Sequence, residues 1–126
     1  MHTPEDLHYT EEHEWIKELD GTRVRIGITD YAQDQLGDVV YVELPEVDAT
    51  VAKEDLIVEI ESTKSVGEVY APFAGTIVAV NDAVAESPEL VNSSPYEEGW
   101  LAEIEVDGEI ETGDLLDAAG YRDLTE

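Results

Sequence analysis

The chain has 126 residues, 32 of them acidic and six basic, and its formal net charge of −26 disfavours binding to nucleic acid or to an anionic membrane. It contains no cysteine, which excludes disulfides, thiol nucleophiles and cysteine-based zinc sites, and no apolar run approaches the roughly 20 residues of a membrane span. The length predicts one domain over residues 1–126, and the first residues show neither a basic leader nor an apolar run, so we expect a cytoplasmic protein.

The first half of the chain predicts strands around one short helix. The strands are expected at residues 9–16, 23–28 and 38–44. In the second of these, branched apolar residues alternate with two arginines and Gly27, so Gly27 is expected on the outward face. The helix is expected to begin after Thr29, a favourable N-cap, and to end at Gly37, because glycine readily adopts the left-handed conformation that closes a helix.

The second half predicts more short strands, separated by turns. The strands are expected at residues 56–61, 68–71, 74–80 and 100–106. A turn is expected at residues 81–82, a helix start at residues 87–88 and a loop at residues 93–100. The tail, from about residue 111 to residue 126, predicts one or two short helices interrupted near Gly120. Strands so closely spaced leave no room for crossover helices, so the pattern predicts an antiparallel sandwich or barrel.

The acidic residues are interleaved with apolar ones, which favours a folded domain with an acidic surface over a disordered tail. Such a surface repels itself at low salt, and the repulsion is relieved when salt screens it. Together with the scarcity of lysine, this pattern predicts a source with a very salty cytoplasm, an extreme halophile. A mesophile protein that is merely acidic is the alternative.

The sequence shows no pattern typical of an active site or a metal site. The three histidines, His2, His8 and His13, have no metal-ligand spacing. The chain has neither a GxSxG nucleophile elbow nor a phosphate-binding glycine loop. Acidic residues are too common for any one pair to indicate acid–base catalysis. The sequence therefore predicts a protein that binds or carries something, with no catalytic residue and no metal ligand.

Lys64 is one of three lysines and lies in a small polar turn, ESTKSV, between two predicted strands. This pattern places Lys64 at the tip of a hairpin, with its side chain pointing into solvent. Two interpretations stay open from the spacing alone. Lys64 is either a solvated turn residue or an amine presented to an enzyme for covalent attachment, because a lysine amine on its flexible stem is a common target of modification.

Four long segments resemble, in order and almost without insertions, the H-protein family of the glycine cleavage system. They are YTEEHEW at 9–15, GITDYAQDQLGDVVYVELPEV at 27–47, VEIESTKSVGEVYAPFAGTIVAVN at 58–81 and LVNSSPYEEGW at 90–100. The tail at 115–124 is similar too. The resemblance implies a mainly β barrel-sandwich hybrid with short flanking helices and a C-terminal helical segment, which agrees with the predicted strands.

The resemblance implies that Lys64 carries lipoic acid in amide linkage and that the chain is a non-catalytic carrier. Its arm would accept the aminomethyl group of glycine from a pyridoxal-phosphate-dependent decarboxylase, the P protein. It would then deliver the one-carbon unit to tetrahydrofolate on the aminomethyltransferase, the T protein. Dihydrolipoamide dehydrogenase, the L protein, would reoxidise the arm, and a lipoylating enzyme is the fourth implied partner.

The resemblance also implies a cleft that shelters the loaded arm. Glu14 matches a family acid proposed to hold the aminomethyl ammonium, and Ser65 matches a position that is commonly small and polar. Glu68 lies where the family often has Asp. Glu12 and Gln35 depart from the small residue and the histidine found in some members, which leaves the details of the cleft open.

Other carriers use a similar hairpin. A biotin carrier favours Met on both sides of the lysine, whereas Thr63 and Ser65 flank Lys64 here. A biotin carrier also has no use for the loop at 93–100. A lipoyl domain of a 2-oxo acid dehydrogenase is shorter and lacks the YTEEHEW start. A relay protein that passes lipoyl groups to other enzymes would use the same lysine, so the sequence leaves that role open.

Overall fold

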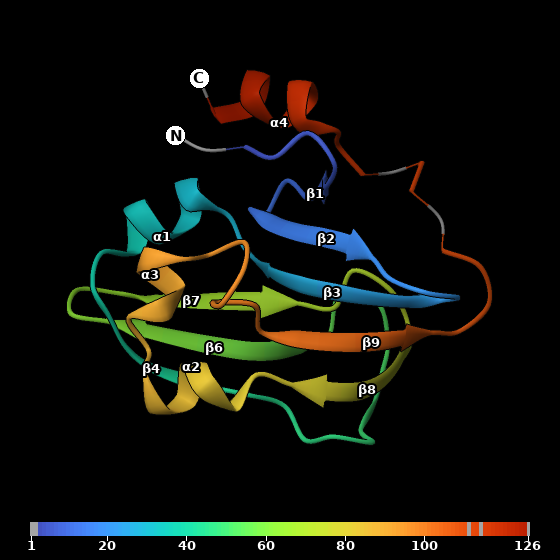
Figure 1. Ribbon diagram of the computed structural model, residues 1–126, viewed down its shortest axis with the longest axis horizontal. Coiled ribbons are helices and arrows are strands. Elements are labelled where there is room, and N and C mark those ends of the chain that lie inside the picture. The colour runs from blue at the N-terminus through green and yellow to red at the C-terminus, as the bar shows by residue number, and fades with distance from the viewer. Residues whose placement is uncertain (1–2, 111, 114, 126) are drawn as a thin grey trace.

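Nine strands and four short helices make up the chain that the computed structural model describes, which is residues 3–110, 112–113 and 115–125 (Figure 1). The strands are β1 (His8–Tyr9), β2 (Glu14–Glu18), β3 (Arg23–Ile28), β4 (Val39–Glu43), β5 (Thr50–Val51), β6 (Leu56–Ser62), β7 (Val66–Tyr70), β8 (Gly75–Val80) and β9 (Ala102–Val106). The helices are α1 (Asp30–Leu36), α2 (Asp82–Glu86), α3 (Leu90–Ser93) and α4 (Ala118–Thr125).

The strands form two antiparallel sheets, which confirms the mainly β sandwich-like fold expected from the sequence. The larger sheet has the strand order β1-β2-β3-β9-β8-β5, and the smaller has the order β4-β6-β7. The main core lies between them, where the inward residues of β3, Val24, Ile26 and Ile28, are buried as predicted. A second cluster packs α4 against β1 and β2, with the rings of Tyr9 and Tyr121 stacked 4.7 Å apart.

Helix α1 has the bounds that the sequence predicts, because its two caps are local. The Thr29 hydroxyl accepts a hydrogen bond from the Ala32 N–H at 3.1 Å, which satisfies one free donor of the first turn. Gly37 closes the helix with φ at 82°, in the left-handed region that favours glycine. The helix is thereby fixed at both ends beside the smaller sheet.

The N-terminal strand prediction is wrong in one respect. Residues 9–16 are not one edge strand, because the chain turns back between β1 and β2 and pairs His8 with Ile16. His13, at the end of this turn, has φ at 70°, which a continuous strand cannot accommodate. The turn brings the His13 side chain to the side of the molecule where α1 begins.

Three further predictions need correction. Asn81 caps α2 rather than forming a free turn, since its side chain accepts a hydrogen bond from the Ala83 N–H. Helix α3 begins at Leu90, later than residues 87–88. In the tail, α4 passes through Gly120 without interruption. Strand β5 was not predicted, and residues 111, 114 and 126 of the predicted tail lie outside the described residues.

The sequence predicts that Gly27 points outward, away from the main core, but the structure shows that Gly27 is buried there. The ring of Trp15 covers it so closely that a Cβ built on Gly27 would lie 2.6 Å from the Trp15 Nε1 atom. Trp15 itself is fully buried, and its Nε1–H donates to the Pro95 carbonyl at 2.9 Å. In the part of the chain that is described, no helix is long and apolar enough to cross a membrane.

Candidate functional site

The β6–β7 hairpin carries Lys64 at its tip, in the place that the sequence predicts (Figure 1). Ser62 organises the turn, because its Oγ accepts hydrogen bonds from the backbone N–H groups of Ser65 at 3.0 Å and Lys64 at 3.3 Å. The Ser62 N–H donates to the Ser65 carbonyl at 2.8 Å. Ser65 thus contributes its backbone to the turn. Small polar residues are favoured here because their side chains replace water at the backbone groups of a tight turn.

The Lys64 side chain is exposed, and its amine forms no ion pair with any carboxylate of the described residues. This is notable in a chain of net charge −26. The stem of Lys64 lies beside Gly37, at the end of α1. The tip is therefore preformed by backbone hydrogen bonds, and it presents a primary amine that no salt bridge has to release.

A cleft of about 390 Å³ runs beside the hairpin, between α1 and β7, and we call it the α1–β7 cleft. Its buried lining is apolar and comprises Ile28, Leu36, Ile60 and Val69. Three exposed polar residues, Glu12, Gln35 and Glu68, also line it. An apolar lining with a few polar groups at its margin suits an apolar ligand that carries one polar end.

Two aromatic residues that no sequence motif marks, His13 and Tyr31, also line the α1–β7 cleft, with ring centroids 4.7 Å apart. His13 Nδ1 lies 2.8 Å from the Tyr121 hydroxyl, which in turn lies 2.7 Å from the Thr29 hydroxyl. Burial lowers the pKa of His13, so its neutral form is favoured. From the sequence alone, the histidines are candidates only for metal binding. The described residues contain no group of three His, Cys, Asp or Glu suited to a metal ion.

Glu14 lies on β2 and is almost completely buried, at 2% exposure. Its Oε2 accepts a hydrogen bond from the Tyr70 N–H at 2.6 Å, and its Oε1 accepts one from the Thr10 hydroxyl at 3.3 Å. The pKa of Glu14 is raised to about 8, because burial and, to a smaller extent, the charge of Glu12 outweigh the opposing effect of the two hydrogen bonds. Glu14 therefore holds a proton at neutral pH.

The predicted site residues do not all share one hollow. Glu68 lines the α1–β7 cleft, whereas Glu14 lines a separate hollow of about 260 Å³ with Tyr70 and Lys53. Glu12 borders both spaces. Tyr70 also connects them, because its hydroxyl donates to Glu68 at 3.3 Å while its backbone N–H donates to Glu14.

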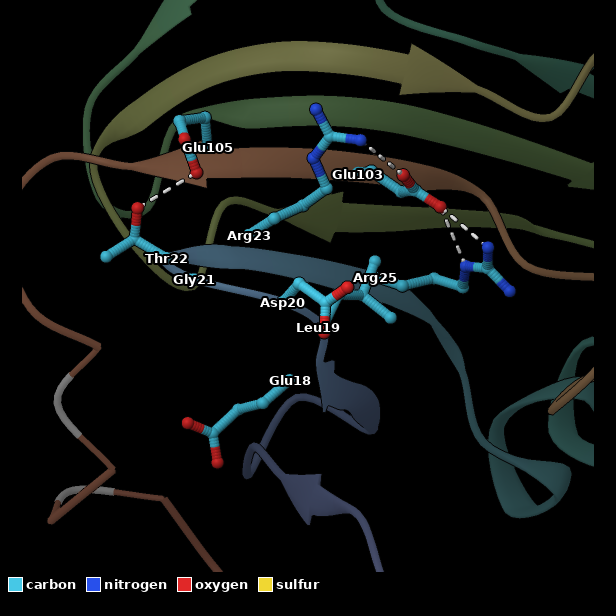
Figure 2. A pocket seen from close by; sticks show the side chains of 9 residues that line it. All are labelled: Glu18, Leu19, Asp20, Gly21, Thr22, Arg23, Arg25, Glu103 and Glu105. Atoms are coloured by element: carbon cyan, nitrogen blue, oxygen red, sulfur yellow. Dashed lines mark hydrogen bonds and ion pairs between the residues drawn. The ribbon is translucent and has the colours of Figure 1, made fainter.

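A larger hollow, of about 870 Å³, lies at the turn between β2 and β3, at the opposite end of the molecule from the hairpin tip (Figures 1 and 2). Figure 2 shows Arg23 and Arg25 paired with Glu103, and Thr22 with Glu105. The Glu103 carboxylate accepts hydrogen bonds from Arg25 at 2.7 and 2.9 Å and lies 3.7 Å from Arg23. Thr22 donates to Glu105 at 3.0 Å. These contacts join side chains of β3 to Glu103 of β9, so Arg23, Arg25 and Glu103 hold one another in place at the edge of the hollow.

Comparisons with known proteins agree with this arrangement. The family model described as "Glycine cleavage H-protein" matches residues 7–126. A glycine cleavage system H protein from Nocardia farcinica is 56% identical over 124 residues, covering 95% of this chain and 94% of the relative. One from Listeria monocytogenes is 52% identical over 126 residues, with complete coverage of both chains. The crystal structure of such a protein from Mycobacterium marinum superposes with a TM-score of 0.85 at 41% identity, covering 95% and 96% of the two chains. The chain therefore belongs to the glycine cleavage H-protein family.

Proposed function

We propose that the chain carries lipoic acid in amide linkage on Lys64 and works as a non-catalytic carrier between the enzymes of the glycine cleavage system. Membership in the family supports this lipoyl-carrier role. Its proposed partners are the decarboxylating P protein, the aminomethyltransferase or T protein, the L protein that reoxidises the arm, and a lipoylating enzyme. We treat residues 1–126 as one carrier domain acting in the cytoplasm.

The observation that carries the proposal is the setting of the Lys64 amine. The amine stands at the tip of a hairpin whose turn is fixed by Ser62, so an enzyme can reach it without unfolding any strand. A primary amine of this kind forms an amide with a carboxylic acid, and arginine cannot replace it in that reaction. Once attached, the lipoyl group supplies a disulfide that accepts and releases the cargo, while the protein supplies position.

The α1–β7 cleft gives the arm a place to rest. Its apolar lining suits a hydrocarbon chain and a dithiolane ring, which gain free energy when they leave water. Glu12 and Glu68 border the cleft, and their carboxylates would attract a positively charged cargo group. Glu14 lies in the adjacent hollow and is protonated at neutral pH, so an ammonium that reached it would favour its ionised form.

Intact mass spectrometry tests the attachment. The chain is produced together with a lipoylating enzyme and lipoic acid, and we expect a mass increase equal to one lipoyl group. Lys64→Arg keeps the positive charge but should abolish the increase, whereas Lys53→Arg, at an exposed lysine elsewhere, should retain it. A biotin increment, or an unmodified chain in cells that lipoylate other proteins, would overturn the proposal.

A relay role, in which the chain supplies lipoyl groups to other enzymes, would use the same Lys64 amine. Deleting the gene separates the two functions. Loss of glycine cleavage alone indicates a dedicated carrier, whereas loss of lipoylation on other enzymes as well indicates a relay.

A further inference from the structure

The stem of Lys64 lies directly over Gly37. A Cβ built on Gly37 would lie 3.2 Å from Lys64 Cε, 3.8 Å from Cδ and 3.9 Å from Cγ. Three successive carbons of the stem therefore run along the surface that the missing side chain leaves open. Gly37 also has φ at 82°, a conformation that residues with a Cβ rarely adopt. The backbone at the end of α1 and the space above it both depend on glycine.

Asn92, from α3, holds the turn that contains Gly37. Its Nδ2 donates to the Gly37 carbonyl at 2.9 Å and to Gln33 Oε1 at 3.0 Å. Its Oδ1 accepts a hydrogen bond from the Val39 N–H at 2.9 Å. The Asn92 side-chain amide thus uses both N–H donors and its oxygen to bind the end of α1 and the start of β4. A side chain with this full set of bonds fixes the position of the turn.

The hairpin tip is attached to the same turn. The Thr63 N–H donates to the Asp38 carbonyl at 3.1 Å, one residue before Lys64 and one residue after Gly37. On the other side, Leu36 lines the α1–β7 cleft and packs against the hairpin, since a Cβ on Gly67 would lie 3.1 Å from its Cδ1. The turn after α1 therefore touches the lysine stem at Gly37 and follows directly on Leu36, which lines the cleft.

We propose that Gly37 and Asn92 are positioning residues for the arm, forming a seat on which the Lys64 stem lies so that an attached arm enters the α1–β7 cleft. This inference rests on the proposed function, because it concerns where a group attached to Lys64 is directed. The seat reduces the conformational entropy that the arm loses on binding in the cleft, because the Lys64 stem is already held in one direction before the arm binds.

The test compares two glycines that share a strained backbone. Gly37→Ala adds a methyl group beneath the Lys64 stem at φ 82°, whereas Gly108→Ala adds one at φ 85° with nothing within 4 Å. Both substitutions should lower the thermal midpoint, because both place a Cβ in the left-handed region. Only the first should disturb the arm. A second variant, Asn92→Asp, keeps the acceptor for Val39 but removes both donors, so the Gly37 carbonyl loses its partner.

The readout is the change in amide chemical shifts at Tyr31 and Gly67, which line the cleft, between the unmodified and the lipoylated chain. In the unaltered chain and in Gly108→Ala, lipoylation should shift both resonances. In Gly37→Ala and Asn92→Asp, most of that shift should be lost, although intact mass shows full lipoylation and circular dichroism shows a retained fold.

The outcomes separate the inference from the proposed function. Equal shifts in all four chains, or no shift in the unaltered lipoylated chain, would overturn the seat while leaving the carrier role standing. Absence of the lipoyl mass from the unaltered chain would overturn the proposed function, and it would also overturn the inference about the seat, which depends on that function. If Gly108→Ala lost the shift to the same extent, the seat would also be contradicted, because backbone strain alone would then explain the loss of the shift in Gly37→Ala.

Discussion

His13 Nδ1 and the Tyr121 hydroxyl lie 2.8 Å apart, although 108 residues separate them in the chain. The same hydroxyl lies 2.7 Å from Thr29, which caps α1. One hydroxyl group on α4 therefore joins a residue that lines the α1–β7 cleft to the first turn of the helix on its other side. The position of the cleft wall thus depends on the C-terminal helix.

Tyr121→Phe should destabilise the protein by about 1 kcal/mol, because it removes the hydroxyl that hydrogen-bonds to the half-buried His13 and to the buried Thr29. The ring and its stacking on Tyr9 are retained, so the change isolates the hydroxyl. Urea unfolding measures the free energy. The matched control is Tyr41→Phe, at a tyrosine that is 49% exposed, which should stay within about 0.5 kcal/mol of the unaltered chain. Equal effects of the two substitutions would contradict the prediction.

Glu14 should make stability fall as the pH rises through the neutral range. Its pKa in the folded chain is about 8, above the ordinary value of 4.5, so between these values the folded state binds more protons than the unfolded state. The contribution of Glu14 is therefore fully present below about pH 4.5 and is lost as the pH passes 8. Glu14→Gln cannot ionise and should gain stability relative to the unaltered chain across this window.

Urea unfolding of both chains at a series of pH values tests this prediction. The informative quantity is the difference between the two free energies of unfolding, since the many other acidic residues contribute equally to both. Glu86→Gln, at an exposed residue of α2, serves as the control for removing one charge. A difference between Glu14→Gln and the unaltered chain that stays constant from acid to alkaline pH would refute the predicted trend.

Gly27→Ala should destabilise the chain by about 1–3 kcal/mol through overpacking. Its Cβ would lie 2.6 Å from the Trp15 ring, which is buried and tied to Pro95 by its Nε1–H, so the ring has little freedom to move. Thermal unfolding measures the loss. Gly113→Ala places the same methyl group in open space and should change the thermal midpoint little. Comparable stability of the two variants would show that Trp15 can adjust.

The sequence predicted those features that depend on neighbouring residues. Thr29 and Gly37 marked the ends of α1 because each cap acts on its own turn. Alternation placed Gly27 on the side away from the main core but could not show that Trp15 covers it from the neighbouring strand, held there by a loop far along the chain. Alternation tells which residues share a face, but not what the fold places on that face.

In the candidate site, too, local features could be predicted from the sequence, whereas contacts between distant segments could not. Lys64 could be predicted from the composition of its turn together with the resemblance, since a hairpin tip is a local structure. His13 could not, because its partner Tyr121 lies at the other end of the chain and no local pattern signals the contact. The resemblance assigned Glu14 and Glu68 to one cleft, yet the two carboxylates line different hollows, a separation that depends on how β2 and β7 are placed in space.

The chain should unfold cooperatively as the salt concentration falls from molar to low millimolar. With a formal net charge of −26, the folded state suffers strong self-repulsion, which salt screens over roughly 3 Å at 1 M but over about 30 Å at 0.01 M. Circular dichroism during a potassium chloride titration measures the midpoint. A variant in which the exposed Glu97 and Glu98 become Gln should need less salt. Full stability of the unaltered chain at low salt would count against this prediction and against a halophilic source.

Among the described strands β7 pairs with β6 alone, and Tyr70, at its end, donates its N–H to the Glu14 carboxylate. An uncovered strand edge is a template on which a second chain can add its own strand. Glu14 already accepts the Tyr70 N–H, so a strand from a second molecule could pair with this end of β7 only by displacing a buried carboxyl group. A carrier that must leave each enzyme it visits benefits from an edge that other strands cannot extend.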